Sequence, residues 1–361
     1  MAATRRGIAG AGNWIIDHIY ICDRWPQEEA LSNILGESRG TGGAPYNCLI
    51  DIARLGPLPS GDGATGELRP APGGTGGTIP LEAVGLTGND PDGEFIRNQM
   101  VDLGVDTAAL TITDTAPTSY TNVMVVQATG RRTFFHNRGA NTHFGPEHVP
   151  VDRIKARLLH FGYLLLLDRF DEPDDHFGTA AARLLSRLQA AGIETSVDVV
   201  SEDSQRFPRI VKPALKYTDY AILNEFETGR TVGRDLRPGG RPDPRAIRAG
   251  AEDLLRLGVR QLVCIHMPEG GYVRTADGRE SWQPSLQLPD GYIKGGAGAG
   301  DAFCSGMLSG IHERWPVERS LKLAVAAAAV CLSHPTCTDA ACSLAKTLAL
   351  AEKYPYQPSI F

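Results

Sequence analysis

The residues with the clearest chemical potential form a run of small side chains that ends in a carboxylate. The run is Gly295-Gly296-Ala297-Gly298-Ala299-Gly300-Asp301-Ala302-Phe303, and residues 301–315 read as a helix. A glycine-rich turn that opens a helix leaves backbone N–H groups free to bind phosphate or a developing oxyanion. An aspartate in the first turn can take the proton of an attacking hydroxyl. Together these features predict phosphoryl transfer, although such turns also begin helices that have no catalytic role.

A second candidate site follows the apolar segment 220–223. Asn224 and Glu227 are three residues apart, so both side chains can face one way and hold a hydrated Mg²⁺ or a phosphate-bound water. The same pair also fits the cap at the start of a helix. The sequence leaves both interpretations open.

The elements that must position these residues alternate along the second half of the chain. Strands are predicted at 158–167, 193–200, 220–223 and 262–266, separated by helices. This order predicts an α/β fold with a mostly parallel sheet sandwiched by helices. Ligands of such sheets bind beyond the carboxyl ends of the strands, so the residues that follow each strand matter most.

The first half of the chain supplies fewer clear elements. A strand is predicted at 14–21, a helix at 44–55 that ends at Gly56, a short strand at 81–85, and a hairpin of 120–127 with 132–135. Residues 57–79 are rich in Gly and Pro and read as a flexible surface insertion. With no repeat and no domain boundary, residues 1–361 are expected to form a single domain.

Composition excludes several classes of function. A net charge of −6 and 42% hydrophobic residues are typical of a soluble protein and argue against nucleic acid as a partner. The most apolar run, 321–332, is too short to cross a membrane, and no secretory signal precedes Asn13, so we expect a cytoplasmic protein with no membrane partner. Seven cysteines in so long a chain are expected to be free thiols, and Cys331, Cys337, Cys342 and His334 match no zinc spacing.

Two motifs lack the flanking residues or elements that their functions require. Gly36-Glu37-Ser38-Arg39-Gly40 matches the serine-hydrolase elbow but lacks an apolar strand before it and a helix after it. Gly10-Ala11-Gly12 begins a dinucleotide fingerprint but lacks its third glycine, and no P-loop sequence occurs.

Five motifs in order give the chain a family resemblance. It resembles the ribokinase-like sugar and nucleoside kinases, also called the phosphofructokinase-B type. The matching segments are Gly42-Gly43-Ala44-Pro45-Tyr46-Asn47, the stretch 85–93, Asn224 with Glu227, and Gly298-Ala299-Gly300-Asp301-Ala302-Phe303, with Asn13 and Asp17 where the family places an early sugar-binding Asp.

The resemblance implies a ribokinase-like fold with a small β lid, whose strands come from about 13–43 and 117–138. It implies ATP and Mg²⁺ as cofactors, with Asp301 as catalytic base and Gly298, Ala299 and Gly300 as the anion hole. Substrate contacts are then expected from Asn13, Asp17, Gly42, Gly43, Asn47 and Arg138, and nucleotide contacts from Asn224, Glu227 and Gly271. Mg²⁺ would be held mainly through ATP phosphates and water near Glu227.

Two departures from the family pattern bear on the cofactors. The family has Asp-Thr-x before Gly298, where this chain has Gly295-Gly296-Ala297, so activation by a monovalent cation is left open. The usual T-x-G-x-x-G nucleotide loop appears as His266-Met267-Pro268-Glu269-Gly270-Gly271, which leaves open how the loop accepts ATP.

Substrate class and assembly are also left with alternatives. The segment 42–47 favours a small sugar, and Arg138 near Arg131 and Arg132 favours a sugar acid or a phosphorylated sugar, unless these arginines are ordinary solvated charges. A nucleoside kinase and a catalytically silent ligand-binding relative are the alternative functions. Exposed strand edges on the lid would favour a homodimer.

Overall fold

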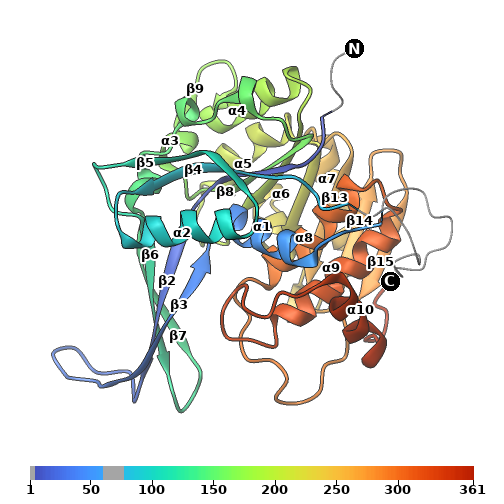
Figure 1. Cartoon of the computed structure of the whole chain (residues 1–361). Coiled ribbons are helices and arrows are strands. Elements are labelled where there is room, and N and C mark those ends of the chain that lie inside the picture. Colours follow the sequence, from blue (N-terminus) through green and yellow to red (C-terminus); the bar gives the residue numbers. More distant parts are fainter. Residues whose placement is uncertain (1–4, 60–76) are drawn as a thin grey trace.

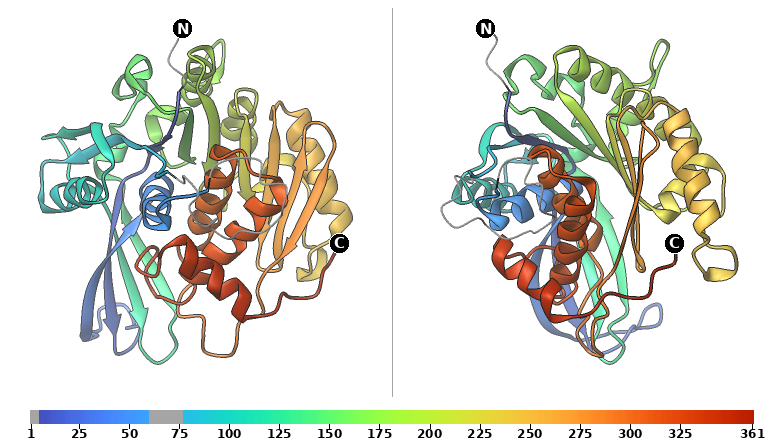
Figure 2. Two further views of the ribbon diagram at one scale, coloured as in Figure 1. Left: turned by 45° about the vertical axis from the view of Figure 1, so that its right-hand side comes forward. Right: turned by 90° about the vertical axis from the view of Figure 1, so that its right-hand side faces the viewer.

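One nine-stranded sheet organises the computed structural model, which describes residues 5–59 and 77–361 (Figures 1 and 2). The strand order across the sheet is β15 (Glu280–Pro284), β14 (Gly270–Thr275), β13 (Leu262–Met267), β12 (Tyr220–Asn224), β11 (Glu194–Val199), β8 (Leu158–Leu164), β1 (Ile8–Gly12), β4 (Leu81–Gly88) and β5 (Asp106–Thr113). The strands from β13 to β5 in this order run parallel to one another, whereas β14 and β15 at the other edge are antiparallel.

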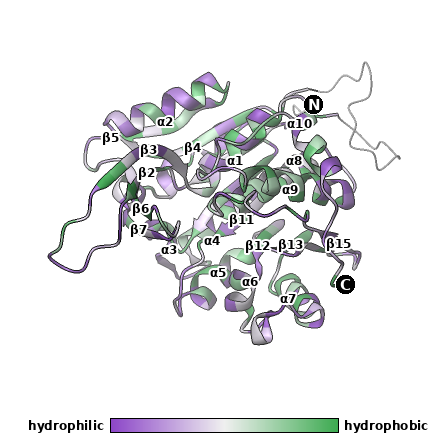
Figure 3. Ribbon diagram, turned by 90° about the horizontal axis from the view of Figure 1, so that it is seen from below, coloured by the Kyte–Doolittle hydropathy of each residue, from purple (hydrophilic) through white to green (hydrophobic). Residues whose placement is uncertain are grey.

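Helices cover both faces of this sheet because its strands are apolar on both sides. In β12, Ala221 and Leu223 enter one hydrophobic core, while Tyr220 and Ile222 enter the other. The first core packs against α3 (Asp168–Asp171), α4 (Ala180–Ala190), α5 (Phe207–Leu215), α6 (Glu225–Val232) and α7 (Pro244–Arg256). The second packs against α1 (Ala44–Leu55), α2 (Pro91–Asp102), α8 (Ala299–His312), α9 (Val317–Cys331) and α10 (Leu344–Lys353). Hydrophobic residues concentrate on α8 and α9 in Figure 3.

A smaller sheet projects from the main body at the lower left of Figure 1. Its order is β3 (Ile34–Gly42), β2 (Ile15–Cys22), β6 (Ser119–Val126) and β7 (Arg132–Asn137), and β2 and β6 are the parallel pair. The register pairs Asp17 with Gly40 on one side and with Thr121 on the other. Since paired residues share a face, these three positions form one patch of the sheet. The whole four-stranded sheet is hereafter called the lid.

Short elements complete the chain. They are the strands β9 (Pro173–Asp174) and β10 (Gly178–Thr179) and the 3₁₀ turns η1 (Gly139–Thr142), η2 (Pro146–His148), η3 (Val151–Arg153) and η4 (Pro238–Gly240). No described helix has the length and apolarity needed to cross a membrane.

The predicted α/β sandwich with a β lid is confirmed, with differences at element boundaries. The helix of Asp301 begins two residues earlier, at Ala299, and the strand predicted to reach residue 167 ends at Leu164. β1 and the edge strands β5, β14 and β15 were not recognised from sequence. Most of the predicted insertion 57–79 lies outside the described residues, and Leu58 pairs with Gly77 in an isolated bridge.

The incomplete dinucleotide motif has a packing role. Gly12 ends β1 with φ 137°, and a Cβ on it would lie 1.7 Å from the carbonyl oxygen of Gly162. A glycine is therefore needed for β1 to approach the end of β8 this closely. The hydrolase-like segment 36–40 lies within lid strand β3, which agrees with its exclusion as an elbow.

Candidate active site

A cavity of about 370 Å³ lies between the lid and the carboxyl ends of the central strands. The structure brings together most of the predicted substrate and catalytic residues there. Those that line it are Asp17, Gly42, Gly43, Asn47, Asn224, Glu227, Gly298, Gly300 and Asp301. We call it the lid cavity.

A second cavity of about 590 Å³ adjoins the first. Asn224, His266 and Gly300 line both of them. The rest of its wall is largely apolar and includes Leu286, Leu288, Ile293, Phe303, Val325 and Leu332. We call it the apolar cavity; the two meet at the start of α8.

The start of α8 is shaped by a glycine that no other residue can replace without strain. Gly298 precedes the helix with φ 80° and ψ −8°, and a Cβ on it would lie 2.6 Å from the Cα of Cys337. The first N–H groups of a helix have no acceptor within it, and they carry the positive end of the dipole. The start of α8 at the junction of the two cavities therefore has the chemistry that can bind an anion.

Asp301 lies in this first turn and is only 6% exposed. Its Oδ2 accepts a 2.7 Å hydrogen bond from Nδ2 of Asn47, and its Oδ1 accepts a 3.0 Å bond from the hydroxyl of Tyr163. Burial raises the pKa of Asp301 above its usual range, and the bonds from Asn47 and Tyr163 oppose that rise. A carboxylate with a raised pKa in a cavity is suited to act as a general base.

The amide of Asn47 is oriented by the helix and strand around it. Its Oδ1 accepts a 2.6 Å bond from the hydroxyl of Thr41, which in turn lies 3.0 Å from the hydroxyl of Thr338. Because Oδ1 is engaged with Thr41, Nδ2 is left to face Asp301.

Two further carboxylates crowd the same cavity. Burial raises the pKa of Glu227 to about 7, against the effect of its bond from the Ser201 hydroxyl. Burial also raises the pKa of Asp198 well above its usual range, and the charge of Glu227 adds to that rise. Crowded carboxylates in a polar cavity favour a divalent cation, which would neutralise them.

Asn224 and Glu227 form the helix cap that the sequence left open as one of two interpretations. The side chain of Asn224 accepts from the backbone N–H of Glu227, and that of Glu227 accepts from the N–H of Asn224, so the two cap α6. Both also line the lid cavity. The cap holds the carboxylate at the cavity wall.

Asp17 faces the lid cavity from β2. Burial raises its pKa to about 6, although a hydrogen bond from Thr121 and the charge of Arg132 act in the opposite direction. A carboxylate held by the lid can accept hydrogen bonds from the hydroxyls of a bound sugar.

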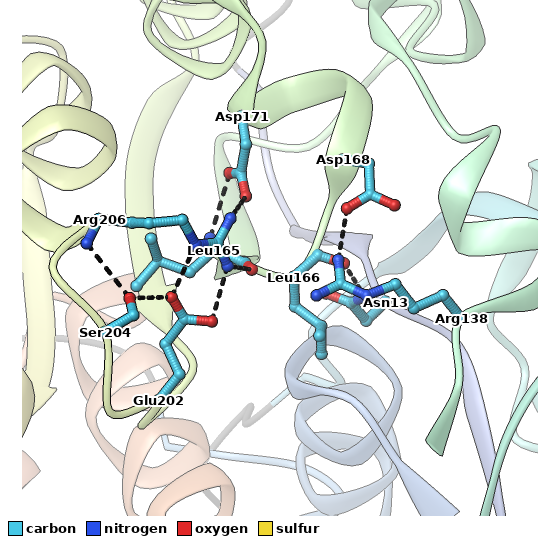
Figure 4. Close-up of polar contacts among 9 residues, drawn as sticks. All are labelled: Asn13, Arg138, Leu165, Leu166, Asp168, Asp171, Glu202, Ser204 and Arg206. Atoms are coloured by element: carbon cyan, nitrogen blue, oxygen red, sulfur yellow. Dashed lines mark hydrogen bonds and ion pairs between the residues drawn. The ribbon is translucent and has the colours of Figure 1, made fainter.

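Four predicted residues do not line the lid cavity. Asn13 is buried, and its side chain accepts from the N–H of Tyr163. It also donates to the carbonyl of Leu166 (Figure 4). Arg138 pairs with Asp168 and does not line the described lid cavity. Gly271 lies in β14, where a Cβ would meet the ring of Phe303 at 2.6 Å, so it provides room for packing. Ala299 lines the apolar cavity.

The structure adds cavity residues that sequence reasoning missed. Tyr163, Asp198 and His266 all line the lid cavity, from β8, β11 and β13. His266 also stacks on Phe303 with 5.1 Å between ring centroids, and burial lowers its pKa to about 4, so the ring is neutral at pH 7. The sequence feature that could have identified these three residues is their position near the carboxyl ends of predicted strands.

Comparisons with known proteins agree with this fold. The pattern of the pfkB family carbohydrate kinases matches residues 8–343. The chain is 23% identical to an ATP-dependent ribose-1-phosphate kinase from Halopiger xanaduensis over 96% of this chain and 98% of that protein. An Arabidopsis thaliana ribokinase solved with ribose and ATP superposes with a TM-score of 0.74 at 19% identity, covering 96% of this chain and 99% of the other. An E. coli protein described as a ribokinase II, solved with ATP and Mg²⁺, gives 0.72 at 17% identity, covering 96% and 99%.

Proposed function

Because the chain belongs to the pfkB family of carbohydrate kinases, we propose that it transfers the γ-phosphoryl group of ATP to a hydroxyl of a small sugar. The observation that carries this proposal is the place of Asp301. Its carboxylate lies at the helix start where the lid cavity meets the apolar cavity. An acceptor hydroxyl from one side and a phosphoryl group from the other could meet there.

Each cavity suits one substrate. The sugar would lie in the lid cavity, with its hydroxyls bound by Asp17 and Asn47 beside Gly42 and Gly43. The adenine would lie against the apolar wall near Phe303. The amides from Gly298 to Gly300 would stabilise the charge that develops on the transferred group, and Asp301 would take the proton of the hydroxyl.

The buried acidic groups fit a metal held through ATP. Glu227 would bind Mg²⁺ through water, with Asn224 beside it, because these two side chains face the junction as a fixed pair. The ion supplies charge neutralisation to the phosphates when it is bound. A bound cation would favour ionised Glu227 and so lower its raised pKa.

The charge of the lid cavity favours a neutral sugar. Its described lining includes Asp17, Asp198, Glu227 and Asp301, and neither an arginine nor a lysine. A sugar acid or a phosphorylated sugar would face these carboxylates without a cationic partner in the wall. Phe134, which is 58% exposed and lines the cavity, favours a nucleoside as the second candidate because its ring can stack on a base.

The test is ADP release from ATP–Mg²⁺ with a panel of neutral sugars, sugar acids, ribose 1-phosphate and nucleosides. Asp301→Asn is compared with wild type, and the exposed Asp175→Asn is the matched control. Turnover on neutral sugars that is lost only in Asp301→Asn supports the proposal. Turnover on nucleosides alone would replace the substrate, and ATP binding without turnover on any compound would indicate a silent binding relative.

We also propose that the lid pairs two copies of the chain. Its far end exposes Trp25, Leu31, Ile34, Leu35 and Phe135, and the rings of Trp25 and Phe135 are stacked 6.2 Å apart. Exposed apolar side chains next to open strand edges favour association. Light scattering should give twice the chain mass of 38.8 kDa for wild type and a lower mass for Leu35→Lys. A monomeric wild type would contradict this pairing.

A further inference from the structure

The carboxyl end of β8 and the loop after it reach Asp301 directly. Residues 162–167 make up this segment, hereafter the Tyr163 loop, and the hydroxyl of Tyr163 lies 3.0 Å from Oδ1 and 3.3 Å from Oδ2 of Asp301. We propose that Tyr163 is a positioning residue for the catalytic base: its phenol holds the Asp301 carboxylate in the orientation that receives the acceptor proton. This inference rests on the proposed kinase function.

The phenol can act only as a donor in this contact. Burial and the charges of Asp301 and Asp198 raise the pKa of Tyr163 well above its usual range, so it keeps its proton at any pH at which the enzyme works. The amide of Asn47 donates to Oδ2 at 2.7 Å, so each carboxylate oxygen has its own donor. Two donors on two oxygens fix the plane of the carboxylate and leave its remaining lone pairs for the substrate.

Asn13 ties the backbone of this loop to the end of β1. Its own N–H donates to the carbonyl of Gly162 at 2.9 Å, and its Oδ1 accepts from the N–H of Tyr163 at 2.6 Å. Its Nδ2 reaches the carbonyl of Leu166 at 3.2 Å (Figure 4). Asn13 therefore acts on the base through Tyr163, a role different from the sugar contact that its sequence position suggested.

The middle of the loop holds a strained residue. Leu165 has φ 75°, a left-handed conformation that is costly for a leucine. Its N–H donates to Oδ1 of Asp171 at 3.1 Å, and its carbonyl accepts from Nη2 of Arg206 at 2.6 Å. Glu202 in turn holds Arg206 by bonds of 2.6 and 2.9 Å (Figure 4). Buried Asp171 and half-buried Arg206 and Glu202 thus fix the loop that presents Tyr163.

No other described group replaces the phenol. Asp301 is faced by Asp17 from β2, by Asp51 and Cys48 from α1, by Asp198 from β11, by Glu227 from α6, by Cys304 of its own helix, and by Cys331 and Cys337. All of these are acids whose negative forms disfavour ionised Asp301. Asn47 and Tyr163 are the two groups whose bonds favour the ionised base.

Tyr163→Phe tests the proposal, with Tyr220→Phe as the matched control. Tyr220 also has a buried phenol that bonds a carboxylate, Glu194 at 3.0 Å, but it lies at the opposite end of the sheet. A hydrogen bond to a charged group supports a loss of about 10- to 100-fold in kcat at pH 7 for Tyr163→Phe, with KM for sugar and ATP changed by less than about threefold. The acid limb of kcat against pH should move up by about one pH unit, because the base loses a donor that favours its charged form.

Several outcomes would contradict the role proposed for Tyr163. An unchanged kcat and pH limb, or a loss no larger than that in Tyr220→Phe, would overturn the positioning role. A higher sugar KM with unchanged kcat would make Tyr163 a substrate contact instead. A wild type without turnover on any sugar would refute the proposed function, whereas an active wild type, an inactive Asp301→Asn and a fully active Tyr163→Phe would refute this inference alone.

Discussion

Asn47 and Asp301 lie 254 positions apart, yet Nδ2 of the one donates a 2.7 Å hydrogen bond to Oδ2 of the other. Asn47 is in α1, which follows the lid, and Asp301 is in the first turn of α8. The contact joins the part of the chain that would bind the acceptor to the group that would deprotonate it. A change at either residue should therefore alter the chemistry and leave the fold intact.

Asn47→Asp should place a second carboxylate beside the base. Two like charges at this distance share a proton, so the pair holds one at pH 7 and the base is partly neutralised. We expect kcat at pH 7 to fall at least about 10-fold and to recover partly as pH rises. The pH profile of kcat measures this effect. Asn47→Ala, which removes the amide without adding charge, should shift the profile less, and identical profiles for the two variants would contradict the contact.

Asp17→Asn should stabilise the protein while weakening sugar binding. The pKa of Asp17 is raised to about 6 in the fold from 3.8, so its ionisation above pH 6 costs folding free energy, and this cost vanishes below about pH 4. We expect the variant to gain about 1–2 kcal/mol in unfolding free energy at pH 7.5 and nothing near pH 4. Denaturant titrations at both pH values measure the difference. Equal gains at the two pH values would show that the charge of Asp17 is not responsible.

Gly300→Ala should block transfer between the cavities. Gly300 lines both, and a Cβ on it would lie 3.2 Å from Cε1 of His266. A methyl group at this junction would displace the phosphoryl group from the base, so we expect a loss of about 100-fold in kcat with little change in thermal stability. Gly36→Ala in the lid, where the nearest atom would be 3.8 Å away, is the control. A Gly300→Ala variant with normal kcat would place the reaction elsewhere.

Activity should depend little on the choice of monovalent cation. Residue 295 is a glycine at the position where the resemblance to ribokinase-like kinases implies an aspartate, and a Cβ on it would lie 2.6 Å from Nη2 of Arg132, which donates to the carbonyl of Pro335 at 3.0 Å. A guanidinium in this position repels a second cation. Replacing K⁺ by Na⁺ at constant ionic strength should change kcat by less than about twofold. Strong activation by K⁺ would contradict this prediction.

The central strands and several helices could be predicted from the sequence because their signals are local. Apolar runs between glycine turns gave the parallel strands, and the small residues before Asp301 gave the helix that carries the base. The edge strands β14 and β15 are not predicted because the segment 270–284 mixes apolar and polar residues without regular alternation, although each strand pairs with its neighbour in the chain. The extent of β8 was overestimated because Leu164 to Leu167 continue an apolar run through a loop.

The residue types of the site were therefore set by the sequence alone: a carboxylate after a glycine-rich turn, an Asn–Glu pair, and an acid in the lid. Which of them meet was decided only by the tertiary structure. The side chain of Asn13 bonds the Tyr163 loop and does not line the lid cavity, and Arg138 pairs with Asp168. Tyr163 donates to Asp301, which lies 138 positions later in the chain. Local patterns determine elements because backbone preferences are short-range, whereas contacts between side chains far apart in the chain depend on how the sheet and its helices pack.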